Sequence, residues 1–220
     1  MNLRAPVLTL LLLLAMTSAA QDLKLAPVDE GANNATWPRF KARLVDALAR
    51  HDQRFILDIV DRKIRNTSET EGVAEFKRLW DPQAADSALW SELGKLLFLG
   101  GVFVKRDKNL VEFCAPYVYY KWPENAGDAS GAIIAKETLL KALPATNAAT
   151  LGTLSYDLVS VIDWEVADNN KASAQKWVKL KAKAGEGYVP EEQVRSPLEY
   201  RACFVNSGTR WRMTALEFGE

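Results

Sequence analysis

The sequence predicts an α+β fold, in which a helical N-terminal unit is completed by a C-terminal β-hairpin and a small β-barrel is inserted between the two. Apolar residues recur at helical spacing between residues 37 and 98, and short strand-like segments separated by turns follow residue 101. The last two of these segments flank a turn at 206–209. Because a hairpin is not stable by itself, we expect it to pack with the N-terminal helices.

Helical spacing predicts four helices ahead of the first strands. Thr36 is expected to cap the first of them, and Pro38 lies in its first turn, where a missing N–H costs nothing. The predicted helices cover residues 37–48, a short segment after residue 52, residues 72–80, and a segment from near residue 86 to the glycines at 100 and 101. The segments 102–104 and 110–114 then have the pattern of paired strands.

The chain carries no net charge, since 28 Lys and Arg balance 28 Asp and Glu. We therefore expect no nucleic-acid partner, because binding to phosphates depends on a basic surface. One histidine and two cysteines leave little material for a metal site, and no glycine-rich phosphate-binding motif occurs. We expect no metal, no cofactor and no catalytic residue.

Residues 1–20 have the features of a signal peptide. Arg4 precedes an apolar run from Val7 to Met16, and small residues at 17–20 supply a cleavage site. The run is about half of the roughly 20 residues that span a bilayer. We therefore expect a periplasmic or secreted protein with no membrane span after cleavage. Residues 21–36 are mixed polar and are interpreted as a flexible leader.

Export changes the interpretation of the two cysteines, Cys114 and Cys203. An even number of cysteines in an exported chain favours a disulfide. The alternative is a pair of buried free thiols that act as small apolar residues. We assign residues 37–128 and 195–220 to the α+β unit that contains both cysteines, and residues 129–194 to the barrel.

The barrel segment carries motifs at regular intervals. Its strands are short and are separated by turns at 144–147, 168–171 and 184–187, which is typical of a small barrel or sandwich. The motifs are ALPAT at 142–146, GTL at 152–154, WVKL at 177–180 and GEGYV at 185–189. Over residues 132–194 the sequence resembles a bacterial SH3-like (SH3b) domain. The flanking segments FCAPY at 113–117 and RSPLEYRACF at 195–204 resemble an uncharacterised group of exported bacterial proteins that carry this module.

Four aromatic residues are the candidate ligand-binding residues: Tyr156, Trp164, Trp177 and Tyr188. If Val178 points into the barrel core, strand alternation places Trp177 on the outer face. The same logic places Tyr188 outside. The four side chains then line a groove for an extended peptide, as in SH3 domains. The alternative is that they seal the barrel or its contact with the helical unit.

The resemblance implies a non-enzymatic binding protein whose partner is a peptide, a protein or a peptidoglycan stem peptide. A different hypothesis is an enzyme or small-ligand binder that uses a pocket in the α+β unit, with Tyr117, Arg201 and His51 as polar contributors. Catalysis by His51 with Cys114 is disfavoured, because the sequence offers no second histidine and no orienting polar residue at a recognisable spacing.

Overall fold

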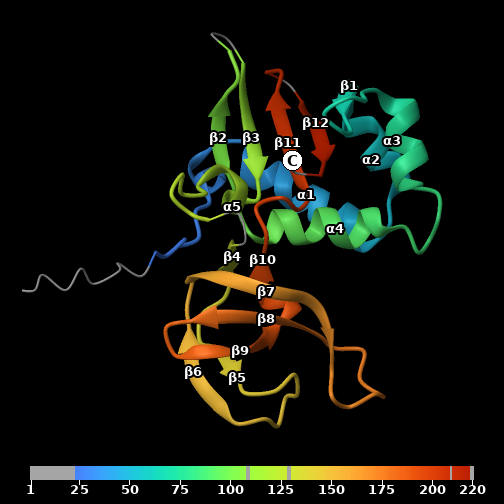
Figure 1. The fold of residues 1–220 in the computed structure, drawn as a ribbon. Helices are drawn as coiled ribbons and strands as arrows, with labels where there is room; N and C mark the ends of the chain where they lie inside the picture. The colour runs from blue at the N-terminus through green and yellow to red at the C-terminus, as the bar shows by residue number, and fades with distance from the viewer. Residues whose placement is uncertain (1–22, 108–109, 128–129, 209, 219–220) are drawn as a thin grey trace, which may run out of the picture.

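The computed structural model describes residues 23–107, 110–127, 130–208 and 210–218 (Figure 1). The expected signal peptide, residues 1–20, lies outside these residues. The fold is mixed α+β, with most of the ordered backbone in two sheets of five and seven strands. None of the described helices is long and apolar enough to cross a membrane.

The N-terminal and C-terminal parts of the chain contribute strands to one five-stranded sheet, and we call the part of the molecule built on it the first unit. Its sheet has the order β1-β12-β11-β3-β2. The final hairpin pairs with β3 along one edge, so the two ends of the chain share one sheet. The strands are β1 (Val60–Arg65), β2 (Val102–Lys105), β3 (Val111–Ala115), β11 (Arg201–Asn206) and β12 (Trp211–Glu217).

Helices pack on one face of this sheet and bury a large aromatic core. Trp37 is 1 % exposed, and its ring centroid lies 3.9 Å from that of Phe113 and 4.9 Å from that of Trp211. Burial of side chains this large supplies most of the free energy that holds helices to a sheet. The helices are α1 (Trp37–Ala49), α2 (Gln53–Ile59), α3 (Val73–Trp80), α4 (Ala88–Phe98) and α5 (Tyr117–Tyr120).

Two local details differ from expectation. Thr36 does not cap α1; instead, Asn34 Oδ1 accepts hydrogen bonds from the backbone N–H groups of Thr36 and Trp37, each at 2.9 Å. The Thr36 hydroxyl accepts a hydrogen bond from Trp211 Nε1 at 3.0 Å, which ties the helix start to β12. Strand β1 was not expected. It pairs in parallel with β12, about 150 residues later in the chain.

The inserted segment forms the second unit, a sheet with the order β10-β4-β7-β8-β9-β5-β6. It has a small aliphatic core that includes Ile133, Leu140, Val178 and Leu180. No closed barrel is found in the described chain, because the edge strands β10 and β6 do not pair. The strands are β4 (Ser130–Ile133), β5 (Thr138–Lys141), β6 (Thr150–Leu154), β7 (Leu158–Ala167), β8 (Lys176–Ala182), β9 (Gly185–Pro190) and β10 (Val194–Arg195).

The described part of the leader is packed rather than free. Leu25 is 5 % exposed, its N–H donates to Tyr156 O at 2.8 Å, and Lys24 forms a β-bridge with Asp157. A short 3₁₀ turn, η1 (Glu30–Asn33), then attaches the leader to the first unit, where the Glu30 N–H donates to Gly101 O at 2.8 Å. The leader is therefore a strap that contacts both units.

Candidate functional site

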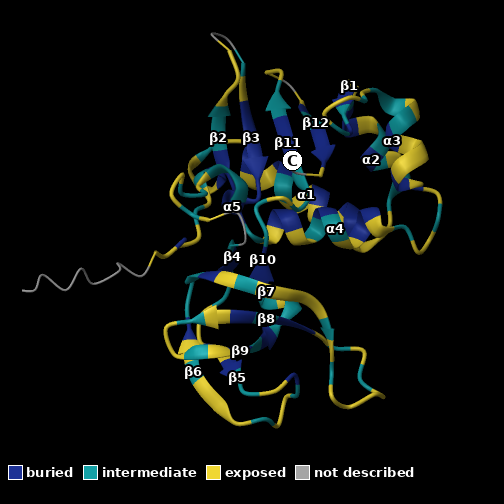
Figure 2. Cartoon of the chain, in the orientation of Figure 1, coloured by how far each residue is buried: buried dark blue, intermediate teal, exposed yellow. Residues whose placement is uncertain are grey.

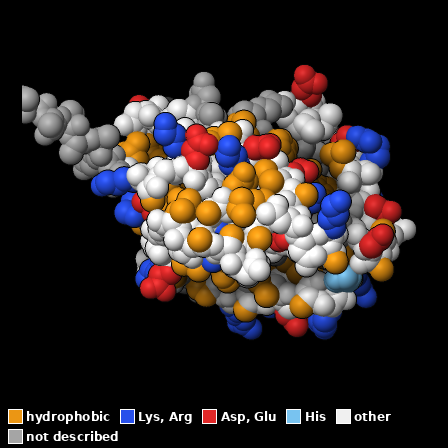
Figure 3. All heavy atoms as spheres, turned by 60° about the horizontal axis from the view of Figure 1, so that its bottom comes forward, with side chains coloured by type: hydrophobic (Ala, Val, Ile, Leu, Met, Phe, Trp, Pro, Cys, Tyr) orange, Lys and Arg blue, Asp and Glu red, His pale blue; other side chains and the backbone are white. Residues whose placement is uncertain are grey.

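A cleft lies between α4 and the second sheet. Its volume is about 1150 Å³, which is at the upper end of ordinary ligand sites. Residues of α4, β7, β10 and the end of β12 contribute to its wall. Figure 2 shows that the side of the second sheet nearest α4 includes long exposed stretches of β7. Figure 3 shows hydrophobic side chains gathered over the middle of the face turned forward, with charged side chains around its margin.

Three exposed aromatic side chains line this cleft. Phe98, at the end of α4, is 88 % exposed, Phe218 is 51 % exposed and Trp164 is 37 % exposed. Single exposed apolar residues are ordinary on a protein surface, but several that share one concave site indicate an interaction surface. The cleft therefore offers apolar contacts from both units.

An irregularity in β7 places two of the cleft residues. The register between β7 and β8 shifts between Asp163 and Val166, and Glu165 has a φ of 57°, in the left-handed region. A bulge of this kind inserts an extra residue and re-aims the neighbouring side chains. A non-glycine residue at positive φ costs on the order of 1 kcal/mol. Trp164 and Glu165 both line the cleft, so this local strain falls within the candidate site.

The charges around the cleft are mainly acidic. Burial raises the pKa of Glu191, and the neighbouring Glu165 carboxylate raises it further. Neither of these two carboxylates forms a salt bridge within the described chain. The residues that line the cleft include five glutamates and three basic residues. The cleft is therefore complementary to a ligand that combines apolar groups with positive charge.

The basic residues of the cleft are partly neutralised by their own partners. Arg195 is 4 % exposed and lies 2.9 Å from Glu199, while its NH2 group donates to Tyr200 O at 2.7 Å. Lys95 pairs with Glu92 at 2.6 Å. Burial raises the pKa of Glu199 in spite of Arg195. Two of the three basic side chains are thus paired, whereas three of the five glutamates form no salt bridge within the described chain.

The four aromatic residues expected to share a groove are not brought together. No ring contact within the described chain joins any two of them. Tyr156 is half-buried beside the leader, with its backbone O bonded to Leu25, and Tyr188 is half-buried in β9 opposite Lys141. Of the four, Trp164 alone lines the cleft.

The expected position of Trp177 on the outer face is wrong. Trp177 is 2 % exposed, and its indole Nε1 donates to Asp168 Oδ2 at 2.9 Å. This hydrogen bond is the main reason that the pKa of Asp168 is lowered. Trp177 lies near the start of β8, where the loop from residue 168 provides a polar partner and a cover. Strand alternation predicts which face a side chain leaves from, but not whether a loop covers that face.

A second cavity of about 710 Å³ lies on the neighbouring face of α4. His51 lines it, with its ring stacked on that of Trp90 at 4.9 Å and 3° between the planes. Neither Tyr117 nor Arg201 lines this cavity. The Tyr117 hydroxyl donates to Leu25 O at 3.2 Å, and Arg201 Nε pairs with Glu217 at 3.2 Å. The polar residues considered for a pocket in the α+β unit therefore do not converge.

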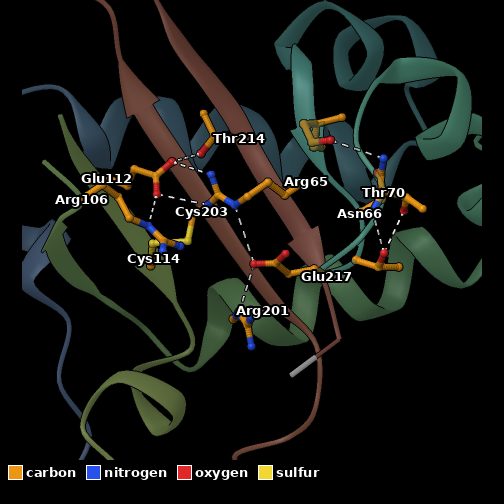
Figure 4. A network of polar contacts seen from close by, with 12 residues as sticks. Arg65, Asn66, Thr70, Arg106, Glu112, Cys114, Arg201, Cys203, Thr214 and Glu217 are labelled. Atoms are coloured by element: carbon orange, nitrogen blue, oxygen red, sulfur yellow. Dashed lines mark hydrogen bonds and ion pairs between the residues drawn. A yellow bond between two sulfur atoms is a disulfide. The ribbon is translucent and has the colours of Figure 1, made fainter. Parts of the chain in front are cut away.

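The face of the first sheet opposite the helices carries a polar network (Figure 4). Glu112, whose side chain is fully buried, accepts from Arg106 Nε at 2.8 Å, from Arg65 NH2 at 3.2 Å and from the Thr214 hydroxyl at 2.5 Å. Burial alone would raise the pKa of Glu112, but these donors outweigh it and hold the pKa below its usual value. Both acidic residues of the network, Glu112 and Glu217, are paired with arginines, although Arg65 Nε and Arg201 NH1 are buried without a hydrogen-bond partner.

Cys114 and Cys203 form a disulfide beside this network, as the sequence predicted. Both cysteines are fully buried and face each other directly across β3 and β11. Together with Glu112 they are the one close group of metal-ligand residue types in the described chain. Because a metal binds the thiolate and not a disulfide sulfur, this group has only one ligand to offer.

Comparison with known proteins adds no functional assignment: no family model, no curated protein and no solved structure matches this chain. The arguments for function therefore depend on the geometry and chemistry of the cleft.

Proposed function

We propose that this chain is an exported, non-enzymatic binding protein, and that its inserted unit is an SH3b-like module that holds an extended peptide against α4. The observation that carries the proposal is the cleft of about 1150 Å³, lined by Phe98, Trp164 and Phe218. Exposed aromatic side chains in a concave site are the usual anchors of protein interfaces. The disulfide supports export, because disulfides persist in oxidising compartments.

The acidic rim indicates what kind of peptide fits. Glu165 and Glu191 lie without salt bridges beside an exposed indole ring. A lysine or arginine side chain gains Coulomb attraction from the carboxylates and cation–π attraction from Trp164. The proposed ligand is therefore an extended peptide segment with basic and apolar side chains. A protein partner or a peptidoglycan stem peptide is the source of such a segment.

Support for a peptide also comes from the backbone of β7. From Asp163 onward β7 pairs only with β8 within the described chain, so its other edge has no strand partner. An edge of this kind can hydrogen-bond to the backbone of an added extended segment. Trp164 and Glu165 lie in this part of the strand.

A displayed library of random linear peptides tests the proposal. The probes are peptides of about 15 residues, which span up to about 50 Å when extended. We expect the selected peptides to carry lysine or arginine next to apolar residues. Fluorescence anisotropy should show a dissociation constant at least about tenfold weaker for Trp164→Ala and for Phe98→Ala. Ile162→Ala is the matched control, because Ile162 is 47 % exposed on the same strand and does not line the cleft.

Purified peptidoglycan forms the second arm of this test. Retention of the wild type, with loss in Trp164→Ala, assigns the cell wall as the source of the peptide. Peptide binding without peptidoglycan retention assigns a protein partner. Failure to select any peptide and to bind peptidoglycan, or equal binding by the cleft variants, overturns the proposal.

The alternative, an enzyme or small-ligand binder with a pocket in the α+β unit, has less support. Of Tyr117, Arg201 and His51, only His51 lines either the cleft or the second cavity, and its ring is stacked on Trp90. A general base needs a second group that positions it or accepts its proton. The cavity beside His51 shares Gly94 and Phe98 with the cleft.

A further inference from the structure

Gly94 lies in the interior of α4, where glycine is a poor choice. Glycine is among the least helix-favouring residues, because it loses the most backbone freedom on folding. Close packing explains some of the other glycines: a Cβ at Gly101 would lie 2.3 Å from Cys114 O, and a Cβ at Gly31 would lie 2.3 Å from the ring of Trp37. A Cβ at Gly94 would meet nothing within 4 Å. Packing inside this chain therefore does not require glycine at this position.

Gly94 and Phe98 line both the cleft and the His51–Trp90 cavity. Ser91, Gly94 and Phe98 lie three and four residues apart, so they follow one stripe along the helix. Ser91 lines the second cavity and is exposed. The small side chains at 91 and 94 thus leave a shallow groove across α4, which we call the pass, between the cleft and the second cavity. Phe98 lies at one side of the pass.

We infer that the bound segment crosses α4 at Gly94 and continues from the cleft into the His51–Trp90 cavity. This inference rests on the proposed function. It assigns a reason for the glycine: the ligand backbone passes close to the helix, and a side chain at 94 would obstruct it. The surface that the ligand contacts is then continuous from the second sheet to α1, which contributes Lys41 and Val45 to the cavity.

The length and chemistry of the occupant follow from this path. An α-helix with its side chains is about 10 Å across, and an extended residue spans about 3.3 Å, so the crossing takes about three residues. With two or three residues in each hollow, the segment has about eight to ten residues in extended conformation. The cleft, with its surplus of glutamates, selects basic side chains, and the second cavity, lined by Val45, Trp90 and Leu97, selects an apolar one. We therefore assign the occupant as a linear segment of a protein partner.

The test uses the full-length mature protein and the peptides of about 15 residues selected on the wild type. Gly94→Gln places a long side chain in the pass, and Gly94→Ala is the matched control with a single methyl group. Both residues favour helix more than glycine does, so neither change should lower the melting temperature. We expect Gly94→Gln to weaken peptide binding about tenfold and Gly94→Ala to weaken it less than about threefold.

A shortened peptide separates the crossing from the cleft. The half of a selected peptide that carries the basic residues should bind more weakly, and its affinity should be the same for Gly94→Gln and the wild type. Full-length peptides that bind Gly94→Gln as tightly as the wild type, while Trp164→Ala still weakens them, overturn the crossing and leave the cleft proposal intact. Failure of the wild type to select any peptide overturns both.

Discussion

Glu112 on the first sheet is fully buried and Glu191 beside the second is partly buried, and their pKa values move in opposite directions. Three donors surround the Glu112 carboxylate and lower its pKa, whereas burial and the nearby Glu165 raise the pKa of Glu191. A carboxylate with its donors in place contributes to folding, but one without them weakens the folded state until a ligand supplies the missing charge. The contrast separates the first sheet from the surface that we propose binds a peptide.

The hydrophobic cores of the two units differ in size and in aromatic content. The first unit buries Trp37, Phe113 and Phe204 in one cluster below its helices, and a disulfide ties its strands. The second unit has a smaller cluster, in which all the fully buried members are aliphatic. Its longest strand, β7, is mostly exposed and bulged. In the proposed function, the first unit with its larger core and disulfide positions the second unit, whose exposed strand β7 contacts the peptide.

Loss of the disulfide should be the largest effect, because it removes a constraint on the scaffold. Cys114 and Cys203 are 89 residues apart, and the chain-entropy relation gives up to about 4.5 kcal/mol for a loop of that length. Cys114→Ala/Cys203→Ala should therefore lower the free energy of unfolding by about 3–4.5 kcal/mol in urea denaturation. Reductant should reproduce most of this loss in the wild type and have no effect on the double variant. A loss below about 1 kcal/mol would contradict the scaffold role.

The two glutamates allow a direct test of the contrast at neutral pH. Glu112→Gln should lower the free energy of unfolding by about 2 kcal/mol, less than for a fully buried pair because Arg65 and Arg106 reach solvent. Glu191→Gln should leave stability unchanged or raise it, since burial and Glu165 disfavour the charged form more than Lys176 and Lys95 favour it. Urea denaturation at pH 7 compares both variants with the wild type. Equal losses would show that the two carboxylates do not differ in role.

The pH dependence gives opposite signs for the two sites. The pKa of Glu112 is lowered in the folded state, so its contribution is present above the unfolded value of about 4.3 and is lost as pH falls through the folded value. The pKa of Glu191 is raised, so its penalty is absent below about 4.3 and grows as pH rises through the folded value. Below about pH 4.3 Glu191→Gln should therefore unfold like the wild type, and the difference between Glu112→Gln and the wild type should shrink progressively as the pH falls further.

Replacement of Trp177 should destabilise the protein less than loss of the disulfide or of the Glu112 carboxylate, and it tests the role of the second unit's buried aromatic ring. Trp177→Phe removes the hydrogen bond to Asp168 and leaves a small gap, so we expect a loss of about 1.5 kcal/mol in the free energy of unfolding. The affinity for the selected peptides should not change, because Trp177 does not line the cleft. Weaker peptide binding by a folded Trp177→Phe variant would return this residue to the binding surface.

Local pattern was sufficient for much of the first unit. The helices α1 to α4, the strands β2 and β3, the final hairpin and the disulfide follow from spacing, glycines, turn residues and cysteine count, although the predicted Thr36 cap does not. Strand β1 was missed because Val60 and Ile64 are its only buried apolar residues and continue the helical spacing of α2. Its partner β12 lies far away in the sequence, and no local signal encodes a pairing at that distance.

The candidate site was harder to predict for a similar reason. Trp164 was one of the four aromatic residues expected to line a groove, but its neighbour Glu165 was not considered, since the bulge beside it depends on the register with β8. Phe98 and Gly94 look like the end and interior of an ordinary amphipathic helix until the second unit is placed beside them. A cleft between two units is a property of their docking, and each contributing segment carries only part of the pattern.

The strap formed by the leader makes the shape of the cleft depend on a segment that lies outside it. Leu23 and Leu25 are bonded to the second sheet, and Glu30 is bonded to the first unit through Gly101 and Phe103. A single proteolytic cut between Leu25 and Glu30 leaves every cleft side chain in place but releases one of three connections between the units. The freed units gain rotational entropy, which a ligand must then overcome on binding. Cleavage of the leader is thus a way to reduce affinity at a distance.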